Sequence, residues 1–147
     1  MKAITVKQPW ADAILLFGKC WENRSWVTNY RGKLAIHAGL GWDQTGVDFI
    51  KRIHSHRISD VFFQEATKRK GMIVGITDLV GCFRLSDQPK GSFGPWATGP
   101  NCWKLNAPRT LLFPIVISGA QGLWNVPEPT ERMIWDLLGE KVAKRVG

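Results

Sequence analysis

Cysteine and long apolar segments are scarce in this sequence of 147 residues. The three cysteines, Cys20, Cys82 and Cys102, are odd in number and far apart, which argues against a disulfide framework and favours free thiols in a reducing compartment. No apolar run approaches the roughly 20 residues that a helix needs to span a bilayer. The first ten residues, MKAITVKQPW, lack the apolar core of a secretory signal. We therefore expect a cytoplasmic protein that does not enter membranes.

Motifs for metals and common cofactors are also missing. No Cys/His cluster has zinc spacing, and His54 and His56 lie two residues apart, which places them on different faces of a helix. There is no P-loop and no dinucleotide fingerprint, because the glycines of GMIVGITDLVG (71–81) follow a strand pattern. The sequence therefore predicts no metal and no cofactor.

Acidic residues and tyrosine are few compared with basic residues and tryptophan. The chain has 20 Lys and Arg against 12 Asp and Glu, a formal net charge of +8, and 8 Trp against 7 Phe and 1 Tyr. Excess positive charge together with flat indole rings suits a site for single-stranded nucleic acid or a nucleotide. Tryptophan also fills cores well, so composition alone does not decide between such a ligand and a large aromatic core.

The hydrophobic pattern predicts one α+β domain, a curved or closed sheet with flanking helices. Helices are expected at 9–18, in the segment 42–70, and in a C-terminal segment capped by Thr130. Gly and Pro crowd residues 87–101, which predicts a long loop. Strands are expected at 2–6, 21–28, 33–38, 71–85, 102–105 and 110–118.

The segment QPWADAILLFGKCWENRSWVTNYRGKLAIHAG (8–39) resembles the ASCH domain family, named for homology to activating signal cointegrator, a transcriptional coactivator. The family hallmark is G-x-K-x-x-E-x-R, which Lys19, Glu22 and Arg24 match, although Phe17 stands at the position of the glycine. Matches to bacterial members extend over most of the chain outside 42–70, in the segments QPW, YRG, IHA, VGITDLVGCF, NCWKLNAPRTLLFPI and GAQGLWNVP.

This resemblance implies a PUA-like β-barrel, with a mostly antiparallel sheet and helices around a cleft. It implies a single ASCH domain over 1–147 with a helical insert at about 42–70. ASCH domains are similar to RNA-binding domains, and some smaller relatives hydrolyse N4-acetylcytidine or cut RNA. In the amidohydrolase relatives the position of Glu22 is typically threonine.

The charged trio of Lys19, Glu22 and Arg24 could contact a nucleic acid directly. On a strand Glu22 and Arg24 share a face, whereas Lys19 opposes Glu22 unless a bend intervenes. Arg24 can grip a phosphate or a base edge and Lys19 supplies a compact charge, while Glu22 can accept from the exocyclic amine of cytosine or adenine. Other candidates are Arg31 in the YRG turn and, as stacking surfaces, the indoles of Trp10, Trp26 and Trp96.

Three functions remain open at this point. The first is binding of RNA, another single-stranded nucleic acid or a nucleotide. The second is an RNA hydrolase or an N4-acylcytidine amidohydrolase, with Lys19 as nucleophile or base and Glu22 as proton carrier; His37 is an alternative base. The third is a coactivator-type module that grips a protein. The purely structural alternative is a Glu22–Arg24 pair that braces a strand, with Lys19 solvated. The basic stretches TKRKG (67–71) and KVAKRVG (141–147) are expected to be solvated faces, although either could extend an RNA-binding surface.

Overall fold

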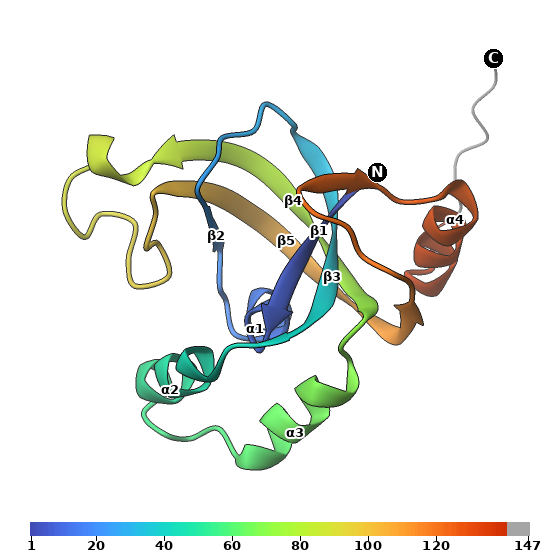
Figure 1. Ribbon diagram of the computed structural model, residues 1–147, viewed down its shortest axis with the longest axis horizontal. Coiled ribbons are helices and arrows are strands. Elements are labelled where there is room, and N and C mark those ends of the chain that lie inside the picture. Colours follow the sequence, from blue (N-terminus) through green and yellow to red (C-terminus); the bar gives the residue numbers. More distant parts are fainter. Residues whose placement is uncertain (141–147) are drawn as a thin grey trace.

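The computed structural model describes residues 1–140, and the basic stretch at 141–147 lies outside the described residues. The expected α+β class is confirmed: one six-stranded mixed sheet carries four helices (Figure 1). The strands are β1 (Lys2–Gln8), β2 (Trp21–Arg24), β3 (Gly32–Trp42), β4 (Met72–Arg84), β5 (Asn101–Val116) and β6 (Leu123–Asn125). The helices are α1 (Trp10–Leu16), α2 (Gln44–Ile53), α3 (Asp60–Lys68) and α4 (Glu128–Leu137), with a 3₁₀ turn at Leu85–Asp87.

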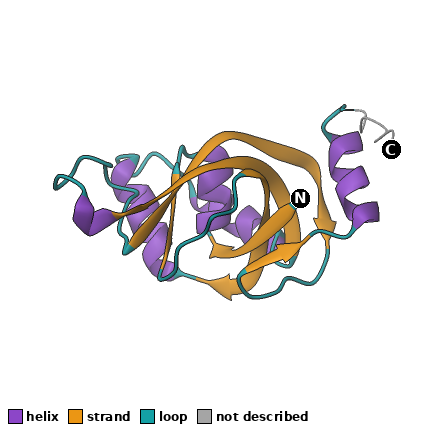
Figure 2. Ribbon diagram, turned by 90° about the horizontal axis from the view of Figure 1, so that it is seen from above, coloured by secondary structure: helices purple, strands orange, loops and turns teal. Residues whose placement is uncertain are grey.

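The sheet is strongly curved but not closed. Its strand order is β2-β5-β4-β3-β1-β6, and all neighbours are antiparallel except β1 and β3. Figure 2 shows the long strands curling around the molecule. Register shifts along β4 accompany this bending. At Gly75 a side chain is impossible, because a Cβ there would lie 2.5 Å from the Arg109 carbonyl oxygen. Strands β2 and β6 form the two edges, so the hydrogen-bonded sheet of the described residues is open.

Several expected boundaries differ from the observed ones. Strand β2 ends at Arg24 instead of continuing to residue 28, and it pairs with β5. The two strands expected at 102–105 and 110–118 form one long bent strand, β5. The expected Thr130 cap is wrong, because α4 begins at Glu128 with Pro127 at the cap position. Pro129 in the first turn has the fixed φ that a helix start favours, which moves the start ahead of Thr130.

The helices bury three apolar clusters against the sheet and one another. Helix α1 packs against β1, β3, β4 and β5, with Ile14 inside the largest cluster beside Trp103. Helix α4 covers a second cluster through Ile134. The expected helical segment at 42–70 forms α2 and α3, which pack on α1 through Ile50 and Phe63. This packing sets α2 beside the end of β1, where the pocket described below opens.

Candidate functional site: a charged pocket with tryptophan walls

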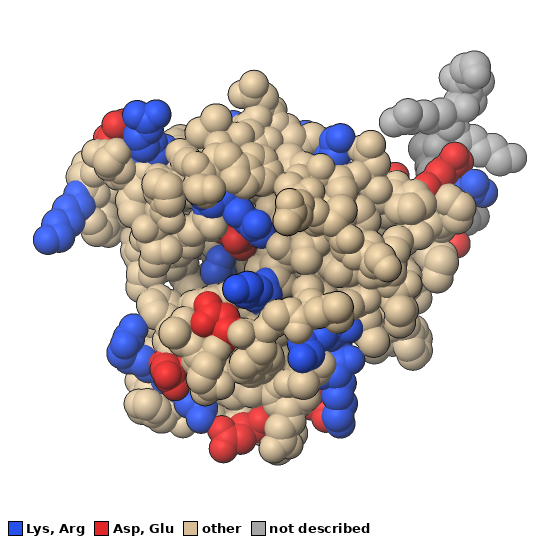
Figure 3. Space-filling model, in the orientation of Figure 1, with Lys and Arg blue, Asp and Glu red and all other residues tan. Residues whose placement is uncertain are grey.

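A deep pocket opens between β1, β2, α2 and the loop that precedes β5. It encloses about 1120 Å³, and the space-filling view shows basic and acidic atoms meeting in a hollow on this face (Figure 3). Six of the seven sequence-predicted site residues line it: Trp10, Lys19, Glu22, Arg24, Trp26 and Trp96. The seventh, Arg31, does not line this pocket; its guanidinium donates to the carbonyls of Thr28 and Tyr30 within its own turn.

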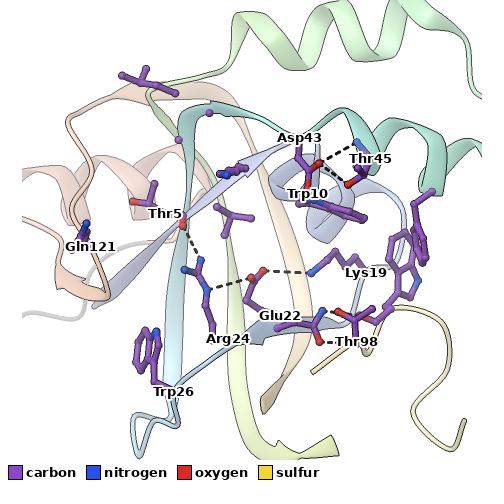
Figure 4. A pocket seen from close by; sticks show the side chains of 18 of the residues that line it. Thr5, Trp10, Lys19, Glu22, Arg24, Trp26, Asp43, Thr45, Thr98 and Gln121 are labelled. Carbon is purple, nitrogen blue, oxygen red and sulfur yellow. Dashed lines mark hydrogen bonds and ion pairs between the residues drawn. The ribbon is translucent and has the colours of Figure 1, made fainter. Parts of the chain in front are cut away.

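Lys19, Glu22 and Arg24 form a row on the pocket floor (Figure 4). The Nζ of Lys19 lies 3.4 Å from Glu22 Oε2, and Arg24 Nε lies 3.3 Å from Glu22 Oε1. Lys19 and Glu22 are only 5% and 7% exposed, yet both line the pocket. The row therefore places one carboxylate between two cations at the base of a cavity that is open to solvent.

A bend before β2 brings Lys19 onto the same side as Glu22. Gly18 has φ of +72°, a left-handed conformation that glycine adopts without strain. The Lys19 N–H donates to the Ala13 carbonyl at 3.1 Å, and the strand begins only at Trp21. The Lys19 Nζ also donates to the Trp21 carbonyl at 2.5 Å. Strand alternation alone would have placed Lys19 and Glu22 on opposite faces, so this turn makes the site possible.

Arg24 links β2, on the pocket floor, to β1, with three strands between them in the order of the sheet. Its guanidinium donates a 2.8 Å hydrogen bond to the backbone carbonyl of Thr5 on β1. The Nε–H is buried and has no aligned acceptor in the described part of the chain, so its contact with Glu22 is an ion pair without hydrogen-bond geometry. Arg24 is thus held at two points, Glu22 and Thr5, in one orientation.

Aromatic rings form two walls of the pocket. On one side Trp10, Phe49 and Trp96 make a cluster, with ring centroids 5.3 to 6.5 Å apart and tilted or edge-on contacts. Lys19 Nζ lies 5.8 Å from the centre of the Trp10 ring. On another side Trp26 rests edge-on against the buried Trp103 at 4.7 Å. These tilted contacts leave Trp10, Trp26 and Trp96 partly exposed in the pocket.

Asp43 orients both Trp10 and the start of α2. Its carboxylate accepts from the Thr45 backbone N–H at 3.0 Å and the Thr45 hydroxyl at 2.6 Å, and from the Trp10 indole N–H at 2.8 Å. The hydrogen bond from the Thr45 hydroxyl, followed by that from Trp10, lowers the pKa of Asp43 below its ordinary value of 3.8. Asp43 therefore supports both a wall of the pocket and the start of α2.

Four of the lining residues that sequence reasoning missed share one face of α2. Thr45, Asp48, Phe49 and Arg52 all line the pocket. Their spacing of i, i+3, i+4 and i+7 is the signature of a single helix face. That periodicity was visible in the sequence, but three of the four residues are polar, so it does not resemble a core face. The helical segment at 42–70 therefore supplies one wall of the site.

The loop that carries Trp96 is fastened to β2. The Asn23 side chain donates to the Trp96 carbonyl at 2.9 Å and accepts from the backbone N–H groups of Thr98 and Gly99 at 2.9 and 3.0 Å. Nearby, Phe93 stacks on Trp21 with centroids 4.2 Å apart and planes within 16°. These contacts hold Trp96 in place as a wall of the pocket.

Other candidate residues lie away from the pocket or have structural contacts. His37 is buried, with Nδ1 3.2 Å from the Thr5 hydroxyl and Nε2 2.7 Å from the Ile117 carbonyl, so both ring nitrogens have partners. Cys102 is buried as well, and its burial raises the pKa of the thiol. Among residues 1–140, no three His, Cys, Asp or Glu side chains gather as a metal site. No helix in that range is long and apolar enough to cross a membrane.

The charge of the pocket is mixed. Its lining includes the cations Lys7, Lys19, Arg24 and Arg52 and the carboxylates Glu22, Asp43 and Asp48. Most of the net charge of +8 therefore lies elsewhere on the chain. Alternating donors and acceptors suit a ligand with polar edges of both kinds better than a bare polyanion.

No protein-family model matches the chain, and a search of curated proteins finds no match either. The functional conclusion therefore depends on the chemistry of the pocket.

Proposed function

We propose that this pocket binds one nucleotide, as part of an RNA strand or free. The observation that carries the proposal is the row Lys19–Glu22–Arg24 on a floor flanked by tryptophan rings. A carboxylate accepts from an exocyclic amine, such as that of cytosine or adenine. The cations beside it retain N–H groups for a base edge or a phosphate, and an indole face stacks on a base.

The dimensions of the pocket support this proposal. Pockets for small molecules and cofactors typically enclose about 300 to 1,000 Å³, and this one encloses about 1120 Å³. It is large enough for a base, a sugar and a phosphate. The buried positions of Lys19 and Glu22 also favour recognition, because polar contacts in a low-dielectric site are stronger than on an open surface.

The proposal extends to the architecture. We propose that the chain is an ASCH-type domain with a PUA-like sheet, as the match of Lys19, Glu22 and Arg24 to the family hallmark implies. The strong curvature of the six-stranded sheet is in keeping with this, although the hydrogen-bonded strands stop short of closure. A close relative whose RNA-bound structure has a different order of strands in the sheet would contradict this proposed architecture.

The test is a calorimetric titration with nucleoside monophosphates. The wild-type protein should prefer cytidine and adenosine monophosphates to uridine monophosphate, because uracil has no exocyclic amine. Glu22→Gln should lose about 5- to 150-fold in affinity for the preferred bases, the equivalent of about 1–3 kcal/mol. Glu65→Gln is the matched control, since Glu65 is exposed on α3 and does not line the pocket. Equal affinity of Glu22→Gln and wild type would contradict the proposal.

A second candidate, hydrolysis of RNA or of an N4-acylated cytidine, is favoured by one observation. Lys19 is 5% exposed, and its amine lies 3.4 Å from a carboxylate that could carry a proton. The assay is turnover of labelled RNA and of acylated cytidine by wild type and Lys19→Ala. Product formation by wild type above the level of the variant would support an enzyme. Equal product formation would leave binding as the function of the site.

A further inference from the structure

We propose that Lys7 and Arg52 are phosphate contacts at the mouth of the pocket, so that its ligand is a nucleotide within a single strand rather than a free nucleotide. This inference rests on the proposed function of the pocket. Both residues line the pocket, and they come from different elements, Lys7 from β1 and Arg52 from the last turn of α2. Two cations on separate elements can contact phosphates on either side of one recognised nucleotide.

Lys7 is exposed, and its aliphatic stem lies over a glycine. Gly41 on β3 has no side chain, and a Cβ there would lie 3.2 Å from Lys7 Cγ and 3.4 Å from both Cδ and Cε. The lysine stem therefore lies along the backbone of β3 at the pocket edge. No carboxylate of residues 1–140 lies within 4.0 Å of its amine. Asp43 is near enough for the charge of Lys7 to contribute to lowering its pKa, but the two form no ion pair, so the amine of Lys7 can still contact a ligand.

Arg52 is exposed as well, and an aromatic ring orients it. The centre of its guanidinium lies 5.3 Å from the centroid of Phe49, one turn earlier on the same helix face. Stacking against a ring holds the planar fork while its N–H groups stay free. In the described part of the chain Arg52 makes no ion pair.

The inner and outer cations of the pocket therefore differ in kind. Lys19 and Arg24 share the carboxylate of Glu22 on the floor, so they are suited to fixing a polar edge of a base. Lys7 and Arg52 are exposed and unpaired within residues 1–140. In nucleic-acid complexes phosphate contacts position the strand, whereas base contacts carry specificity. This arrangement of cations in the pocket matches that division.

The carboxylates of Asp43 and Asp48 also line the pocket, and their negative charge opposes phosphate binding. They differ in the hydrogen bonds that they already accept. Asp43 already accepts three hydrogen bonds, from the Thr45 N–H and hydroxyl and from Trp10. Asp48 is exposed on the same helix face as Arg52. The inference therefore predicts a change of opposite sign: Asp48→Asn should strengthen strand binding where Arg52→Ala weakens it.

The experiment measures strand affinity as a function of salt. Fluorescence anisotropy with a single-stranded RNA of about 8 nucleotides is recorded for wild type, Lys7→Ala, Arg52→Ala, the double variant and Asp48→Asn. Each lost phosphate contact should reduce the slope of log affinity against log salt by about 0.7, and the double variant by about 1.4. Lys90→Ala removes the same charge from an exposed loop position outside the pocket and is the control.

The same variants are titrated with cytidine monophosphate. The loss of affinity in Lys7→Ala, Arg52→Ala and the double variant should be several-fold larger for the RNA strand than for cytidine monophosphate. If both single variants keep the wild-type salt slope while the mononucleotide still binds to wild type, this inference is overturned and the proposed function stands. If wild type binds neither ligand, the proposed function fails first and this inference with it.

Discussion

Arg24 on the edge strand β2 donates a 2.8 Å hydrogen bond to the backbone carbonyl of Thr5 on β1. Three strands, β5, β4 and β3, lie between β2 and β1 in the hydrogen-bonded order of the sheet. The sheet therefore curls until a side chain spans the gap that backbone pairing leaves open. The residue that spans it also belongs to the pocket floor, so one guanidinium takes part both in the contact between β2 and β1 and in the site.

Removing this bridge should cost stability. We predict that Arg24→Ala lowers the free energy of unfolding by about 1–2 kcal/mol, because it removes a charge-assisted hydrogen bond and leaves Glu22 with one cation. Chemical denaturation measures the change. Arg31→Ala is the control, because Arg31 is exposed and bonds only within its own turn. If Arg24→Ala lowers the free energy of unfolding no more than Arg31→Ala does, the contact between Arg24 and Thr5 is not needed for stability.

The loop behind Trp96 should loosen when its clamp is removed. Asn23→Ala takes away the acceptor of the Thr98 and Gly99 amides. Hydrogen exchange at these two amides should accelerate at least tenfold, which corresponds to about 1.4 kcal/mol of lost protection. The amide of Leu105, bonded to the Cys20 carbonyl, is the internal reference. Unchanged exchange at Thr98 and Gly99 would mean that stacking of Phe93 on Trp21 holds the loop by itself.

The start of α2 should be sensitive to acid. Hydrogen bonds from Thr45 and Trp10 lower the pKa of Asp43 in the folded protein, so its stabilising contribution is present above the ordinary value of 3.8 and is lost as the pH falls through the folded value. Asp43→Ala should cost about 1 kcal/mol near pH 7. The difference in free energy of unfolding between wild type and Asp43→Ala should decrease progressively below pH 3.8.

Ser59→Ala is the control for this prediction. Ser59 occupies the cap position of α3, but its side chain makes no capping hydrogen bond. Its replacement should cost much less than that of Asp43, and the cost should not change with pH. Thermal unfolding across the acid range measures both variants. A pH-independent gap for Asp43→Ala would contradict the role assigned to its carboxylate.

A buried ion pair should hold the helical wall to the domain. Asp12 on α1 is 1% exposed; it accepts from Gln8 and from Arg69, which follows α3. Asp12→Ala should destabilise the protein by about 3 kcal/mol, because it takes a partner from the fully buried Gln8 and from the partly buried Arg69. Lys68→Ala breaks an exposed pair on α3 and should change stability far less. Equal effects would indicate that apolar packing alone attaches α3.

Local patterns predicted much of the fold but not how its pieces meet. β-branched alternation indicated β1, and Gly18 marked the end of the first helical segment. Strand alternation also placed Glu22 and Arg24 on one face. The pairing of β2 with β5 depends on residues about 80 positions apart, and nothing in a single sequence specifies that register.

The same limit applies to the site. Six of its residues could be named from the sequence, because the charged trio matches the hallmark of the family that the chain resembles and tryptophan is abundant in the composition. The roles of Asn23 and Asp43 depend on tertiary contacts, with the loop at 96–99 and with Trp10. The helix face with Phe49 and Arg52 mixes polar and apolar residues, so its pattern resembles an ordinary exposed surface.

We propose that Glu22, held between Lys19 and Arg24, receives the polar edge of a base. A crystal structure of the protein soaked with cytidine monophosphate tests it most directly. We expect the exocyclic amine within about 2.7–3.2 Å of the Glu22 carboxylate, with the base against an indole of the pocket wall. A nucleotide bound elsewhere, or in the pocket with its base turned away from Glu22, would contradict it.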